Sequence, residues 1–312
     1  MTPRAEPVVL GGLDVKRVRA IGRPAPAPIL FVHGMWAGAW VWDNWLAFFA
    51  ARGWDGYALN LRGRAGSRPV ADIGRVALAE YVDDAASVAR RLGDVIVIGH
   101  SMGGLIAQAL AARLDPVAVV AVTPAAPRGI WPLRSAALVM ATLRHAPAFV
   151  RSRPLMPSRR LMTRLALGQL PAEEREAVYR KLVPESARQA RDIALRGFAV
   201  DAAAVRCPML VVAAQHDRIT PPSVVRRVAH RYRATLYEYP GFGHMVPLEP
   251  RWRDVALDVA AWLSGFMEGD DGSSAWATCS PRSIGGTEPR AGPNFTISSS
   301  FGNESRRSLH AR

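Results

Sequence analysis

The stretch from Val95 to Gly104 constrains the fold more than any other part of this chain. Val95-Ile96-Val97-Ile98 is a run of branched apolar residues, which is typical of a strand buried on both faces. Gly99-His100-Ser101-Met102-Gly103 follows without a spacer, and apolar residues then recur at helical spacing up to about Arg113. A Gly-x-Ser-x-Gly turn between a strand and a helix is typical of a nucleophile elbow, which exposes a reactive serine hydroxyl.

The spacing of the two glycines has a steric cause. A serine at the tip of such a turn has a strained backbone, and strand and helix nearly touch two residues on either side of it. A Cβ at Gly99 or Gly103 would clash there, and glycine removes it. The pentapeptide also occurs by chance in glycine-rich turns, so the strand before it and the helix after it decide the interpretation. We predict that Ser101 is a nucleophile at the positive end of the following helix.

Strand and helix patterns alternate along most of the chain. This alternation predicts an α/β fold with a doubly wound, mostly parallel sheet. The other predicted strands are Val8 to Leu10, Val15 to Val18, Ile29 to Val32, Tyr57 to Leu59, Val117 to Val122, Met209 to Ala213 and Thr235 to Tyr239. The other predicted helices are Val41 to Ala50, Val76 to Leu92, one after Pro221-Pro222, and Trp252 to Phe266.

Two segments interrupt the alternation. Residues 127–200 give only helical patterns, broken by prolines, and form a predicted helical insertion after the sixth strand. Residues 267–312 are rich in Ser and Gly and have no periodicity, so we expect a disordered tail. The predicted organisation is therefore an α/β core from residues 1–126 and 201–266, the insertion 127–200, and the tail 267–312.

Composition excludes several classes of protein. The chain has 312 residues, 49% of them hydrophobic, which suffices for one large core. Its net charge is +14, but no basic stripe is interleaved with stacking aromatics, so nucleic-acid binding is not predicted. The two cysteines lie far apart, and neither a disulfide framework, a metal site nor a cofactor is indicated. No signal pattern and no membrane-length apolar run is present, so we expect a soluble, cytoplasmic protein.

A nucleophilic serine needs a base, and the base needs an orienting carboxylate. Asp217 follows the predicted strand that ends at Ala213, a position where such a carboxylate fits. The rival position after Val122 has no acid. The competing interpretation is that Asp217 caps the helix that follows.

His244 is the predicted base. It lies just past the predicted strand that ends at Tyr239, and the 27 residues after Asp217 leave room for one helix and one strand. The other histidines fit less well. His100 lies on the elbow itself, and His216 lies beside the acid. His145 and His230 lie in helical patterns, and His310 lies in the tail.

Acyl transfer also requires an oxyanion hole. We predict that the backbone N–H groups of Met102, directly after the nucleophile, and of Met35, in the loop after the third strand, form it. His33 is expected to brace that loop. Trp36 and Met245, which adjoin Met35 and the predicted base in the sequence, are expected to contact the substrate.

With these motifs in this order, the sequence resembles the α/β-hydrolase-fold serine hydrolases, in the branch of esterases, lipases and monoacylglycerol-lipase-like proteins. The resemblance covers roughly Ile29 to Leu263. It rests on His33-Gly34 with Trp40 and Trp42, on Gly99-His100-Ser101-Met102-Gly103-Gly104, on Asp217 with Pro221, and on Gly243-His244 with Leu248-Glu249-Pro250. The loop after the predicted strand Tyr57 to Leu59 departs from the family pattern, because Asn60 replaces an Asp and one residue is inserted. The resemblance implies that the insertion 127–200 is a cap over the active site.

The sequence therefore predicts a hydrolase of carboxylic esters with an apolar acyl or alkyl group. The reaction would pass through an acyl-enzyme on Ser101. Two alternatives stay open: a small-molecule binding or receptor protein on the same fold, and another Ser-Asp-His chemistry such as thioester or C–C hydrolysis, perhydrolysis or acyl transfer. The insertion carries 14 basic and 5 acidic residues, so transient contact with a lipid surface also stays open, as does the oligomeric state.

Overall fold

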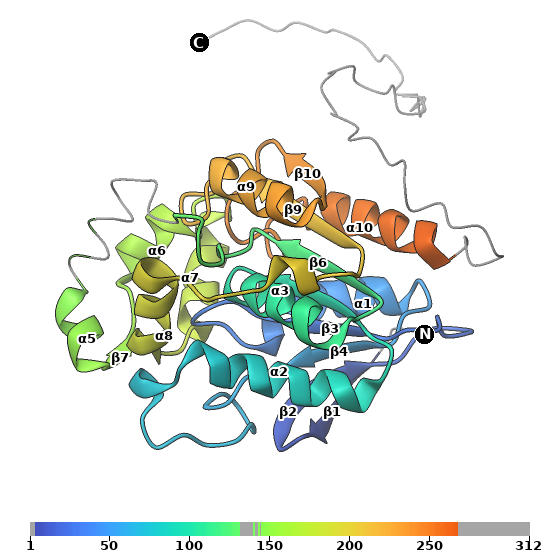
Figure 1. Ribbon diagram of the computed structural model, residues 1–312, viewed down its shortest axis with the longest axis horizontal. Coiled ribbons are helices and arrows are strands. Elements are labelled where there is room, and N and C mark those ends of the chain that lie inside the picture. Colours follow the sequence, from blue (N-terminus) through green and yellow to red (C-terminus); the bar gives the residue numbers. More distant parts are fainter. Residues whose placement is uncertain (1–3, 132–139, 141–142, 144, 268–312) are drawn as a thin grey trace, which may run out of the picture. The chain divides into compact units, whose positions relative to one another are not determined.

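A computed structural model describes residues 4–131, 140, 143 and 145–267 of the chain. Its centre is an eight-stranded sheet in the order β1-β2-β4-β3-β5-β6-β9-β10 (Figure 1). The predicted strands are all present, with small shifts at their ends. They are β1 (Ala5–Leu10), β2 (Leu13–Val18), β3 (Ile29–Val32), β4 (Gly56–Leu59), β5 (Ile96–His100), β6 (Ala118–Val122), β9 (Met209–Ala214) and β10 (Thr235–Tyr239).

The sheet is mostly parallel, as predicted. Strands β1 and β2 form an antiparallel hairpin through a two-residue turn at Gly11 and Gly12, and β2 pairs antiparallel with β4. Every other neighbouring pair is parallel. The carboxyl ends of the parallel strands therefore meet at one edge of the sheet, where an α/β fold places its ligand sites.

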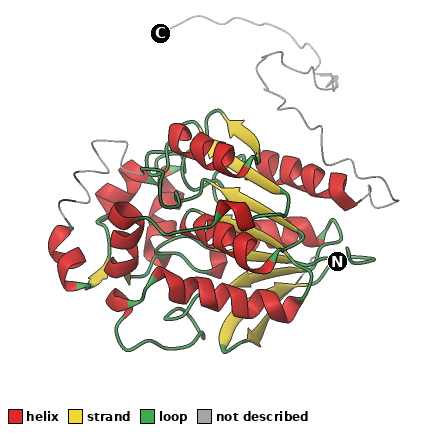
Figure 2. Ribbon diagram, in the orientation of Figure 1, coloured by secondary structure: helices red, strands yellow, loops and turns green. Residues whose placement is uncertain are grey.

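Helices cover both faces of the sheet (Figure 2). In β3, Ile29 and Phe31 pack into a core with α1 and α10, while Leu30 and Val32 pack into a second core with α2, α3 and α9. The predicted helix from Val41 begins instead as a short 3-10 turn. The helical elements of this part are η1 (Ala39–Trp42), α1 (Asp43–Ala50), η2 (Ile73–Arg75), α2 (Leu78–Leu92), α3 (Met102–Leu114), η4 (Ala202–Ala204), α9 (Pro222–Tyr232) and α10 (Trp252–Met267).

The insertion after β6 contains more than helices, which corrects the sequence prediction. Its helices lie together at one end of the sheet, on the left of Figure 1. Strands β7 and β8 pair antiparallel within it. Strands of two residues are too short to leave an alternating pattern, so periodicity could not indicate them. The elements are α5 (Ala146–Arg151), β7 (Pro154–Leu155), α6 (Arg159–Leu165), α7 (Ala172–Lys181), β8 (Glu185–Ser186), α8 (Ala187–Arg191) and the π-helical turn η3 (Asp192–Arg196).

A short parallel bridge joins the two ends of the insertion. Pro127 pairs with Phe198, and the Arg128 backbone N–H donates to the Phe198 carbonyl at 2.8 Å. The insertion therefore leaves and rejoins the core at neighbouring points. The predicted disordered tail lies, apart from Met267, outside the described residues. Within the described part, no helix is both long and apolar enough to cross a membrane.

Candidate active site

Ser101 lies at the tip of the sharp turn between β5 and α3. Its φ and ψ are 56° and −116°, a backbone conformation that side-chain-bearing residues rarely adopt. A Cβ on Gly99 would come within 2.1 Å of the Gly103 carbonyl oxygen, and a Cβ on Gly103 within 2.1 Å of the Val32 oxygen. The turn closes only because both positions are glycine, as the sequence argument predicted.

Ser101, His244 and Asp217 form a hydrogen-bonded chain. The Ser101 hydroxyl lies 2.9 Å from Nε2 of His244, and Nδ1 of His244 lies 2.8 Å from Oδ2 of Asp217. An ionised carboxylate only accepts hydrogen bonds, so Nδ1 carries the proton and Nε2 is free to accept from the serine. The three predicted residues, which come from the loops after β5, β10 and β9, are thus brought together and buried.

Asp217 is held by the turn that precedes α9. Its Oδ1 accepts the backbone N–H groups of Ile219 at 2.8 Å and Thr220 at 2.9 Å. The Thr220 hydroxyl lies 2.7 Å from Asp217 Oδ2 and 3.0 Å from the Thr123 carbonyl oxygen. Asp217 therefore does not cap α9, whose N-cap residue is Pro221; one of its oxygens closes the turn before the helix and the other faces His244. The sequence argument did not identify Thr220.

The backbone of His244 is held by two further side chains that the sequence argument left without a role. Nε2–H of His100 donates to the His244 carbonyl at 2.7 Å, and the Thr123 hydroxyl donates to the same oxygen at 3.2 Å. Burial, and then the charge of His244, lower the pKa of His100 to about 3. His100 is therefore neutral, and its one ring proton is committed to this contact.

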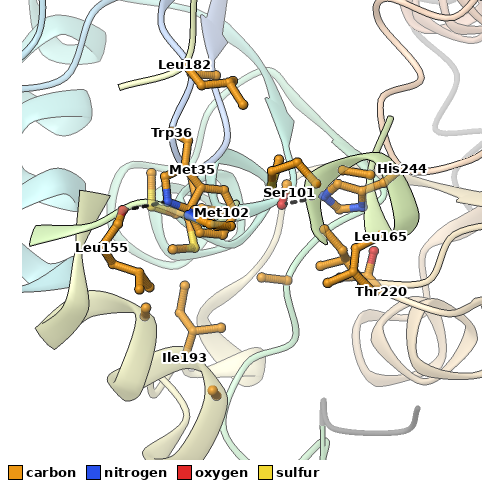
Figure 3. Close-up of a pocket in the computed structure, with 18 of the residues that line it drawn as sticks. Met35, Trp36, Ser101, Met102, Leu155, Leu165, Leu182, Ile193, Thr220 and His244 are labelled. Atoms are coloured by element: carbon orange, nitrogen blue, oxygen red, sulfur yellow. Dashed lines mark hydrogen bonds between the residues drawn. The ribbon is translucent and has the colours of Figure 1, made fainter. Parts of the chain in front are cut away.

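The two predicted oxyanion donors lie beside Ser101. Figure 3 shows Ser101 between His244 on one side and Met35 and Met102 on the other. Within the described ranges, no group accepts a hydrogen bond from the backbone N–H of Met35 or of Met102. Both donors are therefore free for a ligand oxygen.

His33 braces the loop that contains Met35, as expected. Its Nδ1–H donates to the Gly34 carbonyl at 2.7 Å, and its Nε2 accepts the Leu61 backbone N–H at 3.3 Å. Burial, and then the charge of Arg64, lower the pKa of His33 to about 3, so the ring stays neutral. The divergent Asn60 supports the same region, because its side chain accepts from the Ala39 N–H at 2.8 Å and donates to Asp14 at 2.7 Å.

A cavity of about 150 Å³ opens at Ser101 between the sheet and the insertion (Figure 3). Trp36 and Met245, the two predicted substrate contacts, both line it. Its polar side chains are few: Ser101, His100, His244, Thr220 and His145. The insertion supplies most of the apolar wall, including Phe149, Leu155, Pro157, Met162, Leu165 and Leu182.

Among the described residues, the remaining histidines fit the sequence interpretation with one exception, and His310 lies outside the described residues. His145 lines the cavity, whereas its helical pattern favoured an ordinary packed or solvated side chain. His216 and His230 are exposed and belong to neither the hydrogen-bonded chain nor the cavity. Over the described ranges, no group of three or more His, Cys, Asp or Glu side chains could hold a metal ion.

Comparison with known proteins identifies the family to which this fold belongs. A model of the alpha/beta hydrolase family matches residues 29–259, which is most of the chain. The chain belongs to the alpha/beta hydrolase family. A search of curated proteins found no match.

Several solved structures share the fold of this family member. A thermophilic esterase from Thermogutta terrifontis superposes with a TM-score of 0.62 at 21% identity, covering 84% of this chain and 98% of the esterase. A monoacylglycerol lipase from Paleococcus ferrophilus gives 0.59 at 23% identity, with 81% and 98% covered. A putative non-heme bromoperoxidase from Mycobacterium tuberculosis gives 0.64 at 18% identity, with 82% and 97% covered. At such identities the likeness establishes the fold and leaves the reaction open.

Proposed function

We propose that this protein is a serine hydrolase that cleaves carboxylic esters through an acyl-enzyme on Ser101. One observation carries the proposal: the chain of hydrogen bonds from Asp217 through His244 to Ser101 ends at the floor of an apolar cavity. A serine activated in this way attacks acyl carbonyls. The esterase and the monoacylglycerol lipase among the structural relatives support this choice within the family.

Acylation begins when His244 Nε2 takes the Ser101 proton and Oγ attacks the ester carbonyl carbon. The carbonyl π electrons move to oxygen, and the resulting oxyanion accepts hydrogen bonds from the Met35 and Met102 N–H groups. Asp217 stabilises the imidazolium formed at His244. The tetrahedral intermediate then collapses, and the alkoxide leaves with the proton from His244 Nε2.

Deacylation repeats these steps with water. His244 takes a proton from a water molecule, whose oxygen attacks the acyl carbon and forms a second oxyanion in the same hole. Collapse of this intermediate releases the carboxylic acid and returns the proton to Ser101. No group beyond these side chains and two backbone amides is needed for the cycle.

The substrate class follows from the cavity. Its wall is apolar except around Ser101 and His244, which favours an alkyl or acyl chain over a sugar or peptide. Because the insertion supplies much of this wall, we propose that residues 127–200 act as a cap that shapes the acyl site. Met35, Met102, Met162 and Met245 line the cavity with flexible side chains that adapt to chains of different length.

A fluorophosphonate probe and a chain-length series test the proposal. We expect rapid labelling of the wild-type protein, no labelling of Ser101→Ala, and turnover of p-nitrophenyl esters of about four to ten carbons in preference to acetate. Slow or absent labelling together with ligand binding would favour a binding protein. A preference for thioesters in the same panel would favour that chemistry, and a strict preference for acetate would contradict the proposed acyl site.

A further inference from the structure

Glu185 is a buried carboxylate that the proposed mechanism does not use. It lies in β8, inside the insertion, and its exposed fraction is 0%. A buried carboxylate is stable only when charge and hydrogen bonds compensate for the lost water. Its partners therefore show what holds it in place.

Both oxygens of Glu185 are fully engaged. Oε1 accepts the Tyr81 hydroxyl at 2.6 Å and the Ser186 backbone N–H at 2.8 Å. Oε2 pairs with Nη2 of Arg64 and accepts the backbone N–H of Trp36 at 3.3 Å. Burial, and then the negative charge of Glu185, raise the pKa of Tyr81, so its phenol stays protonated and donates. Three of these four partners belong to the core rather than to the insertion.

The Arg64–Glu185 ion pair contacts the loop after β3 at two successive residues. Glu185 accepts from the Trp36 N–H, while Nε of Arg64 donates to the Ala37 carbonyl at 2.9 Å. Arg64 is itself only 4% exposed, so water does not compete for these contacts. The ion pair thus fixes the backbone directly after Met35.

Trp36 has a backbone conformation that needs such support. Its φ is 61°, in the left-handed region that a bulky residue rarely adopts. Its carbonyl accepts the Val183 N–H at 2.9 Å, and its indole N–H donates to the Leu155 carbonyl at 2.9 Å (Figure 3). Val183, Leu155 and Glu185, the three residues that bind Trp36 in these contacts, all belong to the insertion.

Two peptide planes flank the Cα of Met35. The plane before it contains the Met35 N–H and the Gly34 carbonyl, which His33 holds. The plane after it contains the Trp36 N–H, which Glu185 holds. Because both planes are held, the direction of the Met35 N–H is fixed before any substrate binds.

We propose that Glu185 is a positioning residue of the oxyanion hole. Through the Trp36 N–H it sets the backbone around Met35, so that the Met35 N–H points to the oxyanion formed at Ser101. The inference rests on the proposed ester hydrolysis. It also means that the hole is complete only when the insertion is packed on the core.

Glu185→Gln tests the inference with almost unchanged volume. An amide is uncharged and presents an N–H₂ group to a site built of four donors, so Arg64 loses its counter-charge and at least one backbone N–H or guanidinium N–H loses its acceptor. We expect kcat for p-nitrophenyl butyrate to fall about 10- to 100-fold, with KM changed less than about threefold. The affinity of a trifluoromethyl ketone, which forms an oxyanion on Ser101, is expected to fall in parallel with kcat/KM.

Asp84→Asn is the matched control. Asp84 is 2% exposed and forms a bidentate pair with Arg62, at 2.8 Å to Nε and 2.7 Å to Nη2, without a contact to Trp36. This variant is expected to melt at a lower temperature but to keep kcat and ketone affinity within about threefold. If it loses them as strongly as Glu185→Gln does, the effect is general destabilisation and the inference is wrong.

Glu185→Asp keeps the test usable if Glu185→Gln does not fold. It retains the charge but withdraws the oxygens by one methylene from the Trp36 N–H, and kcat is again expected to fall about 10-fold or more. A folded variant with wild-type kcat and ketone affinity overturns the inference about Glu185 but leaves the proposed function unaffected. A wild-type protein with neither ester turnover nor fluorophosphonate labelling overturns the proposed function, and the inference falls with it.

Discussion

The two halves of the site are held by different parts of the molecule. On the base side, Asp217 and His244 are held by Thr220, Thr123 and His100, all of them core residues. On the oxyanion side, Trp36, which directly follows Met35, is held by contacts from the insertion. The contacts that hold the proposed nucleophile and base therefore come from the core, whereas those that hold the residue after the second proposed oxyanion donor come from the insertion.

This difference predicts that damage to the two sides has different signatures. A change on the base side alters proton transfer and leaves the oxyanion donors in place. A change on the insertion side leaves the proton relay in place and weakens stabilisation of the intermediate. The predictions below test that division, beginning with the largest effect.

Ser101→Ala removes the residue that lies between the base side and the oxyanion side of the site. Without the nucleophile, kcat for esters is expected to fall by a factor on the order of 10⁴ to 10⁶, while residual binding persists in the cavity. Steady-state rates and the circular dichroism spectrum measure activity and fold separately. Near wild-type turnover would show that another residue is the nucleophile.

Asp217→Asn removes the charge that supports His244. The amide is expected to disturb the tautomer and the charge support of the imidazole, so kcat falls on the order of 10²- to 10⁴-fold with little change in KM. The affinity of the trifluoromethyl ketone should fall less than kcat, because both oxyanion donors stay in place. An unchanged kcat and pH–rate profile would assign the role to another carboxylate.

Thr220→Val and Trp36→Phe form a matched pair, one on each side. The first removes the hydroxyl 2.7 Å from Asp217 Oδ2, and the second removes the indole N–H that donates to Leu155 at 2.9 Å. We expect kcat to fall about 10-fold for Thr220→Val and about three- to fivefold for Trp36→Phe. Only the Trp36 variant should lose ketone affinity in proportion to kcat, and equal losses in both variants would contradict the division.

Glu249 gives the base side a pH dependence of stability. It is 2% exposed and accepts the Gly243 N–H at 2.8 Å, and burial is the main cause that raises its pKa from 4.5 to about 7. Between these two values the folded state holds more protons than the unfolded chain, so stability falls as pH rises through this window. At about 1.4 kcal/mol for each unit of pKa difference, the loss is about 3 kcal/mol.

Glu249→Gln is expected to remove this dependence and to be the more stable protein at pH values above the window, with little change in kcat. Chemical denaturation of both proteins on either side of the window measures it. An equal pH dependence in wild type and variant would show that Glu249 does not titrate there.

Local patterns were sufficient to predict much of this site from the sequence. The elbow around Ser101 has a steric signature, and Asp217 and His244 follow strands whose apolar runs are visible in the sequence. Glu185 has no such signature, because Tyr81 and Arg64 lie 104 and 121 residues away in the chain. An acid in an arginine-rich segment looks like a solvated residue until the tertiary contacts are known.

The short strands β7 and β8 were missed for a related reason. Two residues cannot show a period, and β7 begins with Pro154, which weakens a strand assignment further. His100 likewise gains its role from the carbonyl of His244, 144 residues away, whereas Thr220 contacts Asp217 only three residues away and was missed although the contact is local. Sequence reasoning therefore found the three residues that the structure joins by hydrogen bonds, and missed most of those that hold them in place.

The buried Arg64–Glu185 pair also restricts how the insertion can be exchanged between relatives by recombination. A chimera that takes residues 127–200 from a protein without this carboxylate would leave Arg64, 4% exposed, without a counter-charge. Such a loss costs about 3–5 kcal/mol, a large share of the stability of a typical domain. Arg64 and Glu185 are thus expected to be transferred together, as one unit of inheritance spread over two distant parts of the chain.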